Sequence, residues 1–165
     1  MKNIVLIGMP GCGKTSIGRK AAELLNMKYV DTDEQIEIKE GRSINNIFTE
    51  NGEKYFRIIE SSIVAETSSV CGNIISTGGG VVLNEENITK LKRNGVIIFI
   101  DRAPELIING VDTSGRPLLR GKADTIKILY EQRIGLYRRY ADYTVENNES
   151  LESCIEAICE IGRTV

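Results

Sequence analysis

Short apolar runs alternate along the chain with segments whose apolar residues recur at helical spacing. Asn3–Ile7 is a continuous apolar run, typical of a strand buried on both faces, and Asn73–Ser76 and Val96–Ile100 have the same character. Lys28–Asp33 and Tyr143–Val145 are expected to form two more short strands. Strands that alternate with helices predict an α/β fold, with a parallel sheet covered by helices on both faces.

The segments between these strands predict helices and one long loop. The expected helices are Lys14–Asn26, Gln35–Glu40, Ser43–Glu50, Glu53–Val70, Asn87–Arg93, a brief one opening at Pro104–Ile108, Ala123–Ala141 and Leu151–Ile161. Gly110–Lys122 is rich in Gly, Asp, Ser and Pro and predicts a loop. No repeat or linker divides the 165 residues, so a single domain over 1–165 is expected.

Composition narrows the chemistry that such a domain can perform. Hydrophobic residues make up 41% of the chain and charged residues 27%, which is typical of a globular protein. The chain has no histidine, which excludes a Ser-His-Asp triad, a Cys-His dyad and a His-ligated zinc site. Acid–base work is left to Asp, Glu, Lys, Tyr or an ordered water.

Charge and cysteine usage bear on partners and compartment. Twenty-one basic residues oppose 23 acidic ones, so no nucleic-acid partner is expected. No apolar run approaches the roughly 20 residues of a membrane span, and no signal peptide is evident at the N-terminus. Cys12, Cys71, Cys154 and Cys159 form no C-x-x-C pair. We expect a cytoplasmic protein with reduced thiols, acting as a monomer.

Gly8–Thr15 (GMPGCGKT) matches the phosphate-binding pattern G-x-x-x-x-G-K-[ST]. It follows a predicted strand and opens a predicted helix, as the motif requires. Its glycines allow backbone N–H groups to face phosphate oxygens, Lys14 can reach the β- and γ-phosphates, and Thr15 can ligate Mg²⁺. The loop alone does not separate a kinase from a GTPase or a motor ATPase, but no N-K-x-D element follows a later strand. A kinase with an acceptor pocket is favoured.

Carboxylates and an ion pair are candidates for the acceptor side. Asp31 and Asp33 lie two apart, so on a strand both side chains would point to one face, suited to Mg²⁺-water coordination and to proton acceptance from a hydroxyl. The alternative is a helix N-cap on a solvated turn. Arg57 and Glu60 lie at i, i+3 on a predicted helix, where an exposed ion pair is the ordinary alternative.

Three further features lie near predicted strand ends or in the loop. Thr77–Gly80 follows a strand, and its three glycines would let a ligand or another segment approach closely, unless they form a loose turn. Arg116 lies in the predicted loop, where it would close over transferring phosphate or be an ordinary surface arginine. Arg133 lies among other cations on a helix, for which a solvated face is the default.

Taken together, these motifs resemble the shikimate kinase family in order and spacing. The resemblance runs from Val5 to about Val145 and rests on the phosphate loop, Asp31-Thr32-Asp33, Phe56-Arg57-Ile58-Ile59-Glu60, Ser76-Thr77-Gly78-Gly79-Gly80, Arg116-Pro117-Leu118-Leu119 and Arg133. It implies a three-layer αβα P-loop fold with a five-stranded parallel sheet in the order 2-3-1-4-5. Shikimate-binding helices are implied at about 33–62 and a lid at about 110–122.

The resemblance also implies an activity and residue roles. The family transfers the γ-phosphoryl group of ATP to the 3-hydroxyl of shikimate, on the route to chorismate and aromatic amino acids. Asp33, Lys14 and Arg116 would be catalytic, and Thr15 and Asp31 would hold Mg²⁺. The ATP-binding residues would be Gly11, Cys12, Gly13, Lys14, Thr15, Ser16 and Arg116. The shikimate-binding residues would be Asp33, Phe48, Phe56, Arg57, Glu60, Gly78, Gly79, Gly80 and Arg133.

The adenine side departs from the family pattern. Asn109 stands where members often carry an arginine that stacks on adenine, and Asn148 lies in Glu146–Glu149, where a second arginine is often found. We therefore expect weaker ATP affinity or looser base selectivity. Two other functions stay open on the residues alone: a gluconate- or nucleotide-type kinase, and a P-loop module that senses nucleotide without turnover.

Overall fold

The computed structural model describes residues 1–110 and 119–165, with side chains described except at 119–122. Its elements follow in the order β1 (Asn3–Ile7), α1 (Lys14–Leu25), β2 (Lys28–Asp31), α2 (Thr32–Glu40), α3 (Ile44–Ser68), β3 (Asn73–Ser76), the 3₁₀-helix η1 (Val81–Leu83), α4 (Glu85–Asn94), β4 (Gly95–Asp101), α5 (Pro104–Gly110), α6 (Leu119–Tyr140), β5 (Tyr143–Glu146) and α7 (Leu151–Thr164). No helix in these described ranges is both long enough and apolar enough to cross a membrane.

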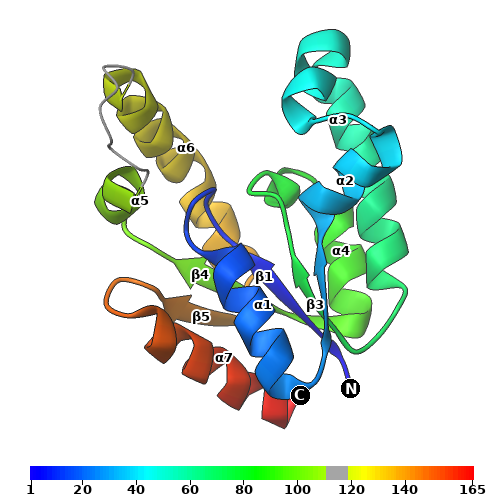
Figure 1. Ribbon diagram of the computed structural model, residues 1–165, viewed down its shortest axis with the longest axis vertical. Helices are drawn as coiled ribbons and strands as arrows, with labels where there is room; N and C mark the ends of the chain where they lie inside the picture. Colours follow the sequence, from blue (N-terminus) through cyan, green and yellow to red (C-terminus); the bar gives the residue numbers. More distant parts are fainter. Residues whose placement is uncertain (111–118) are drawn as a thin grey trace.

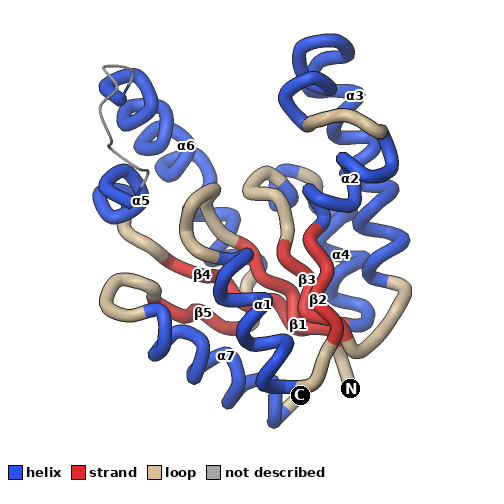
Figure 2. The backbone as a smooth tube through the Cα atoms, viewed as in Figure 1, coloured by secondary structure: helices blue, strands red, loops and turns tan. Residues whose placement is uncertain are grey.

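The five strands form one parallel sheet in the order β2-β3-β1-β4-β5, which confirms the expected topology. Helices α1 and α7 pack together on one face, and α3, α4 and α6 lie on the other (Figure 1). The tube view shows the central strands enclosed between these two layers, while α2 and the first part of α3 extend beyond the sheet (Figure 2). The α/β fold is the three-layer αβα arrangement expected from the sequence.

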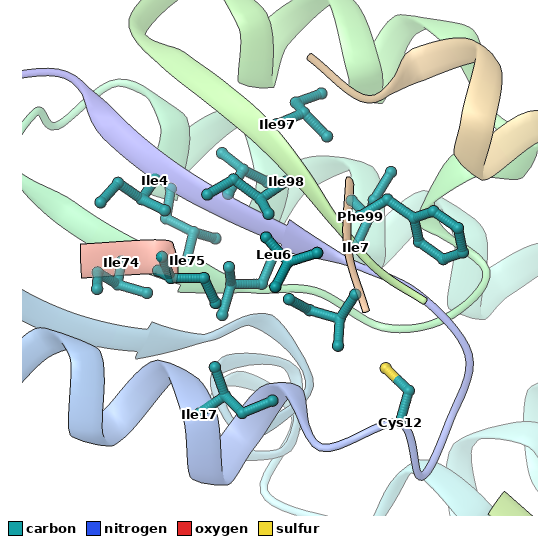
Figure 3. Packing of buried hydrophobic residues seen from close by; sticks show 14 of the residues in the cluster. Ile4, Leu6, Ile7, Cys12, Ile17, Ile74, Ile75, Ile97, Ile98 and Phe99 are labelled. Atoms are coloured by element: carbon teal, nitrogen blue, oxygen red, sulfur yellow. The ribbon is translucent and has the colours of Figure 1, made fainter. Parts of the chain in front are cut away.

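The core lies where the central strands meet the helices. Every residue of β1 is buried, as its continuous apolar run predicts for a strand covered on both faces. Isoleucines from β1, β3 and β4 interdigitate with Phe99, and the Cys12 thiol points into the same cluster (Figure 3). A second, smaller cluster joins α2 to α3 through Ile36, Ile47, Phe56 and Ile63. The core thus reaches the strand ends that carry the sequence motifs.

The strand expected over Lys28–Asp33 is too long, and the helix expected at Gln35–Glu40 begins too late. Strand β2 ends at Asp31 and α2 begins at Thr32. The Asp31 carboxylate accepts a hydrogen bond from the Asp33 backbone N–H at 3.0 Å, so Asp31 is the N-cap of α2. Asp31 and Asp33 therefore do not share one face of a strand, because capping turns the chain between them.

Helix α3 has two arms that join at Gly52, as the two separate helices expected there imply. Gly52 has φ 78° and ψ 174°, while a Cβ at this position would meet nothing within 4 Å. The glycine is therefore needed for its backbone conformation rather than for space. Both arms of α3 contribute to the cluster with Ile36 of α2, and α3 also packs on α4.

The loop expected over Gly110–Lys122 is too long at both ends. Gly110 belongs to α5, and α6 begins at Leu119 rather than at Ala123. The residues Leu, Arg, Lys and Ala around Gly121 have high helix propensity, and one glycine within them is tolerated at a cost of about 1 kcal/mol. Most of the expected lid, including Arg116, lies outside the described residues.

Candidate active site

The carboxyl ends of β2, β3 and β1 lie side by side and bring three sequence motifs to one edge of the sheet. Asp31 pairs in register with Ser76, and Ser76 with Leu6, just before the phosphate loop. A cavity of about 390 Å³ opens at this edge. It is lined by Pro10, Gly11, Gly13, Lys14, Thr15, Ser16, Asp31, Asp33, Ser76, Thr77 and Gly79. This is the position at which open α/β sheets bind ligands.

The phosphate loop wraps around its own lysine. The Lys14 Nζ donates to the carbonyl oxygens of Gly8 and Met9, each at 2.8 Å, and lies 3.6 Å from the Cys12 Sγ. Gly8, Gly11 and Gly13 all have positive φ. Their conformations turn successive peptide planes around the start of α1, which matches the cradle expected from the motif.

Cys12 and Asn147 stabilise the phosphate loop from the protein interior. The Cys12 side chain is fully buried in the core, so any contact of Cys12 with a nucleotide is made by its backbone. The buried Asn147 Nδ2 donates to the Cys12 carbonyl at 2.9 Å. The Cys12 carbonyl and the Gly13 N–H belong to one trans peptide, so the Gly13 N–H points away from Asn147. The sequence pattern gives no signal for Asn147, because only the fold places the β5–α7 turn beside the phosphate loop.

Asp31 caps α2 and also lines the cavity. Besides capping α2, its Oδ2 accepts a hydrogen bond from the Thr15 hydroxyl at 3.3 Å and one from the Tyr29 hydroxyl at 3.0 Å. Carboxylate and hydroxyl oxygens suit Mg²⁺, which also keeps several waters and substrate phosphates as ligands. Within the described ranges no cluster of three acidic or cysteine ligands could hold a metal by itself. Thr15 and Asp31 therefore fit a metal that is held mainly by phosphate and water.

Asp33 presents a carboxylate oxygen that the described part of the chain leaves unpaired. Its Oδ1 is buried and has no hydrogen-bond partner among the described residues. Burial, and then the neighbouring carboxylates of Asp31 and Glu60, raise the pKa of Asp33 to about 6. A buried, unpaired oxygen beside a phosphate loop is suited to accept a hydrogen bond and a proton from a ligand hydroxyl.

The pair of Arg57 and Glu60 is not the exposed ion pair that helical spacing alone favours. Glu60 is 1% exposed, and its Oε2 accepts a hydrogen bond from Arg57 Nη1 at 2.8 Å. Burial raises the pKa of Glu60, an effect that Arg57 and Arg133 oppose. The exposed Glu53 contacts the Nε and Nη2 of Arg57 at 3.3 and 3.1 Å. Glu60 thus anchors one side of the guanidinium from within the protein.

Each of the three glycines after β3 makes room for a different neighbour. A Cβ on Gly78 would lie 2.7 Å from Asp33 Oδ1, and one on Gly79 would lie 2.7 Å from Pro10 Cδ. A Cβ on Gly80 would overlap the guanidinium of Arg57. The loose-turn alternative is therefore wrong: the glycines let one backbone segment lie against the acidic residue, the phosphate loop and the arginine.

Besides the glycines, the candidate site includes two aromatic side chains and a second arginine. The rings of Phe48 and Phe56 lie 4.6 Å apart, and the Arg57 guanidinium lies over the Phe56 ring at 5.2 Å. Arg133 is partly buried on α6, and its charge opposes the rise that burial causes in the pKa of both Glu60 and Tyr137. In the described part of the chain, Arg133 makes no salt bridge. Its partial burial shows that it does not lie on a wholly solvated surface.

The expected adenine side holds no arginine at the two positions noted in the sequence. Asn109 lies in α5. The Asn148 Oδ1 accepts a hydrogen bond from the Ala103 N–H at 2.9 Å, which ties the turn after β5 to the turn after β4. Asn148 thus has a structural partner.

Comparison with known proteins decides the family. The family model described as shikimate kinase matches residues 10–161. The chain belongs to the shikimate kinase family. It is 42% identical over 162 residues to the shikimate kinase of Caldanaerobacter subterraneus subsp. tengcongensis, covering 96% of this chain and 94% of that protein. A shikimate kinase of Clostridium botulinum is 44% identical over 162 residues, covering 98% of each chain.

Solved structures agree with this membership. A shikimate kinase from Acinetobacter baumannii in complex with shikimate matches with a TM-score of 0.88 and 33% identity, covering 99% of this chain and 92% of that one. A gluconokinase from Sinorhizobium meliloti matches with a TM-score of 0.65 at 14% identity, covering 99% of this chain and 93% of that one, a likeness of fold alone. The assignment of this chain to the shikimate kinase family therefore rests on both sequence and structure.

Proposed function

We propose that this chain transfers the γ-phosphoryl group of ATP to the 3-hydroxyl group of shikimate, giving shikimate 3-phosphate and ADP. The observation that carries the proposal is the unpaired, buried Oδ1 of Asp33 in the same cavity as the phosphate loop. A base beside a phosphate cradle brings acceptor hydroxyl and γ-phosphate into line, and such positioning supplies most of the catalysis in phosphoryl transfer.

The nucleotide side is formed by Gly11–Ser16. Backbone N–H groups of the loop and the positive end of α1 hold the phosphates, with Lys14 reaching the β- and γ-phosphates. For this, the Lys14 Nζ exchanges its bonds to the Gly8 and Met9 carbonyls, wholly or in part, for phosphate oxygens. Arg116, proposed to reach the transferring phosphate, lies outside the described residues.

Thr15 and Asp31 are proposed to hold Mg²⁺, Thr15 directly and Asp31 through water. The bound ion would neutralise phosphate charge as it develops. The 3.3 Å hydrogen bond from Thr15 to Asp31 keeps the two side chains together at the cavity wall, and the Tyr29 hydroxyl donates to the same oxygen of Asp31.

On the acceptor side, Asp33 accepts the proton of the attacking hydroxyl. Arg57 and Arg133 hold the acceptor carboxylate, a task for which the planar guanidinium is suited, and Glu60 orients Arg57. The backbone of Gly78, Gly79 and Gly80 lies along the ring, with Phe48 and Phe56 on the apolar side. The substrate-binding helices at 33–62 and the lid at 110–122 complete the proposal, together with a single monomeric kinase domain that acts in the cytoplasm.

The test is ADP release with Mg²⁺-ATP and three kinds of acceptor: shikimate, gluconate and a panel of nucleoside monophosphates. We expect ADP release that depends on shikimate and is negligible with the others. Greater ADP release with gluconate or a nucleotide would show that this compound, and not shikimate, is the acceptor. Nucleotide binding with no turnover on any acceptor would favour a sensing module and contradict the proposal.

A further inference from the structure

Tyr137 is a buried polar residue for which the roles proposed so far have no use. It lies on α6 and is fully buried, with its ring stacked on Phe99 at 5.1 Å and an interplanar angle of 16°. Its hydroxyl donates a 2.6 Å hydrogen bond to the Gly79 carbonyl and lies 3.9 Å from the Met9 Sδ. Burial raises the pKa of Tyr137 to about 12, so the hydroxyl remains a donor throughout the neutral range.

The residue that accepts this bond is held from two sides. Gly79 lines the cavity and packs against Pro10 of the phosphate loop, while Tyr137 fixes its carbonyl oxygen. The peptide that joins Gly79 to Gly80 is trans, so the Gly80 N–H points away from Tyr137. Gly80 in turn lies directly against the Arg57 guanidinium. A single hydroxyl thus fixes the peptide on which Arg57 rests.

Tyr137 also lies one helical turn after Arg133, on the same side of α6. Burial raises the pKa of Tyr137, and the charge of Arg133 opposes that rise, so the two side chains influence each other. Arg57 comes from α3 and Arg133 from α6, two helices that stand on opposite sides of the strand ends in Figure 1. The bond from Tyr137 to Gly79 therefore joins the two arginine-bearing parts of the site.

We propose that Tyr137 is a positioning residue for the acceptor carboxylate: its hydroxyl ties α6 to the Gly79–Gly80 peptide and so sets the spacing between Arg133 and Arg57. This inference rests on the proposed function. Tyr137 touches neither the acceptor nor the nucleotide in this role and acts through the two arginines.

The test compares Tyr137→Phe, which keeps the ring and its stacking on Phe99, with Tyr130→Phe. Tyr130 lies on the same helix, and its hydroxyl bonds to Asp101 at 3.4 Å, away from the glycines. We expect Tyr137→Phe to raise the KM for shikimate roughly tenfold, as for the loss of one well-formed hydrogen bond, with the KM for ATP within about twofold. Tyr130→Phe should leave both KM values within about twofold.

Shikimate methyl ester separates positioning from a general loss of structure. Because the ester lacks the carboxylate that both arginines hold, Tyr137→Phe should change its KM by less than about twofold. Equal losses on acid and ester, equal losses for shikimate and ATP, no change in either KM, or failure of Tyr137→Phe to fold would each overturn the inference. Failure of the proposed function is distinct, because the unaltered protein would then show no shikimate-dependent ADP release.

Discussion

The two walls of the cavity are built in different ways. The phosphate wall is a run of eight consecutive residues, Gly8–Thr15, and the Lys14 Nζ finds both of its close oxygen partners within that run. The acceptor wall combines Asp33 of α2, Arg57 and Glu60 of α3, the glycines after β3 and Arg133 of α6. None of these segments adjoins the next along the chain.

The walls also differ in what they leave unpaired. The buried polar side-chain atoms without partners in the described structure include Asp33 Oδ1 and Glu60 Oε1, both of the acceptor wall, and no atom of the phosphate loop. An unpaired buried oxygen costs about 1 to 3 kcal/mol of stability. The acceptor wall thus gives up stability for groups that a ligand can satisfy, whereas the phosphate wall is preformed by local backbone geometry.

Among the changes to the two walls, replacing Asp33 by asparagine should have the largest effect on activity. Asp33→Asn should lower kcat by about 10²- to 10⁴-fold, the usual contribution of a positioned base, in an ADP-release assay. Glu34→Gln is the matched control, because Glu34 is a neighbouring exposed carboxylate paired with Arg19 on the surface, and its kcat should be unchanged. A kcat for Asp33→Asn within threefold of the unaltered protein, roughly, would remove Asp33 from the mechanism.

The pH profile should show the raised pKa of Asp33. With that pKa at about 6, kcat/KM should fall about tenfold per pH unit below pH 6 and level off above it, since only the ionised carboxylate accepts a proton. A profile that stays level down to pH 4.5, roughly, would contradict this assignment.

The same shift has a consequence for stability with a definite sign. Between the ordinary aspartate pKa of 3.8 and about 6, the folded state binds more protons at Asp33 than the unfolded state does. The contribution of Asp33 to the free energy of unfolding therefore falls as pH rises through this range, by up to about 3 kcal/mol at about 1.4 kcal/mol per pKa unit. In thermal melts, the stability of Asp33→Asn relative to the unaltered protein should increase from pH 4 to pH 6, roughly, and then stay constant at higher pH.

Arg57 pairs with one buried and one exposed glutamate, so replacing each in turn compares the energetic contribution of a buried and an exposed ion pair. Glu60→Gln should cost roughly 2 kcal/mol of stability and raise the KM for shikimate, since it removes a buried, charge-assisted hydrogen bond. Glu53→Gln, which removes the 63%-exposed partner, should cost less than about 1 kcal/mol. Thermal melts and acceptor titrations measure both, and equal effects of the two changes would contradict the distinction.

The smallest expected effect lies at the far end of the phosphate wall. Because Asn109 and Asn148 stand where the family often has arginines, the KM values for ATP and GTP should differ by less than about tenfold. Parallel titrations with the two nucleotides measure this. Tight binding restricted to ATP would show that other residues select the base.

Some features of this protein follow from the sequence alone. The phosphate-loop motif and the parallel α/β sheet were predicted from local spacing and apolar runs, whereas the strand order was predicted from the resemblance to the shikimate kinase family. The end of β2 was not predicted correctly, since the Asp31 cap that stops the strand has the same two-residue spacing as a pair on one strand face. Local pattern does not distinguish these two conformations.

What only the tertiary structure decided is the surroundings of each candidate side chain. Spacing favoured an exposed ion pair for Arg57 and Glu60, yet packing of α3 over the glycines buries Glu60. Tyr137 and Asn147 acquired roles because α6 and the β5–α7 turn come to lie against distant loops. Burial and the partners of a polar atom depend on contacts between segments far apart in the chain, and these set its pKa and its hydrogen bonds. The sequence by itself determined which chemical groups this protein carries, and the fold determined which of them stay unpaired for a ligand.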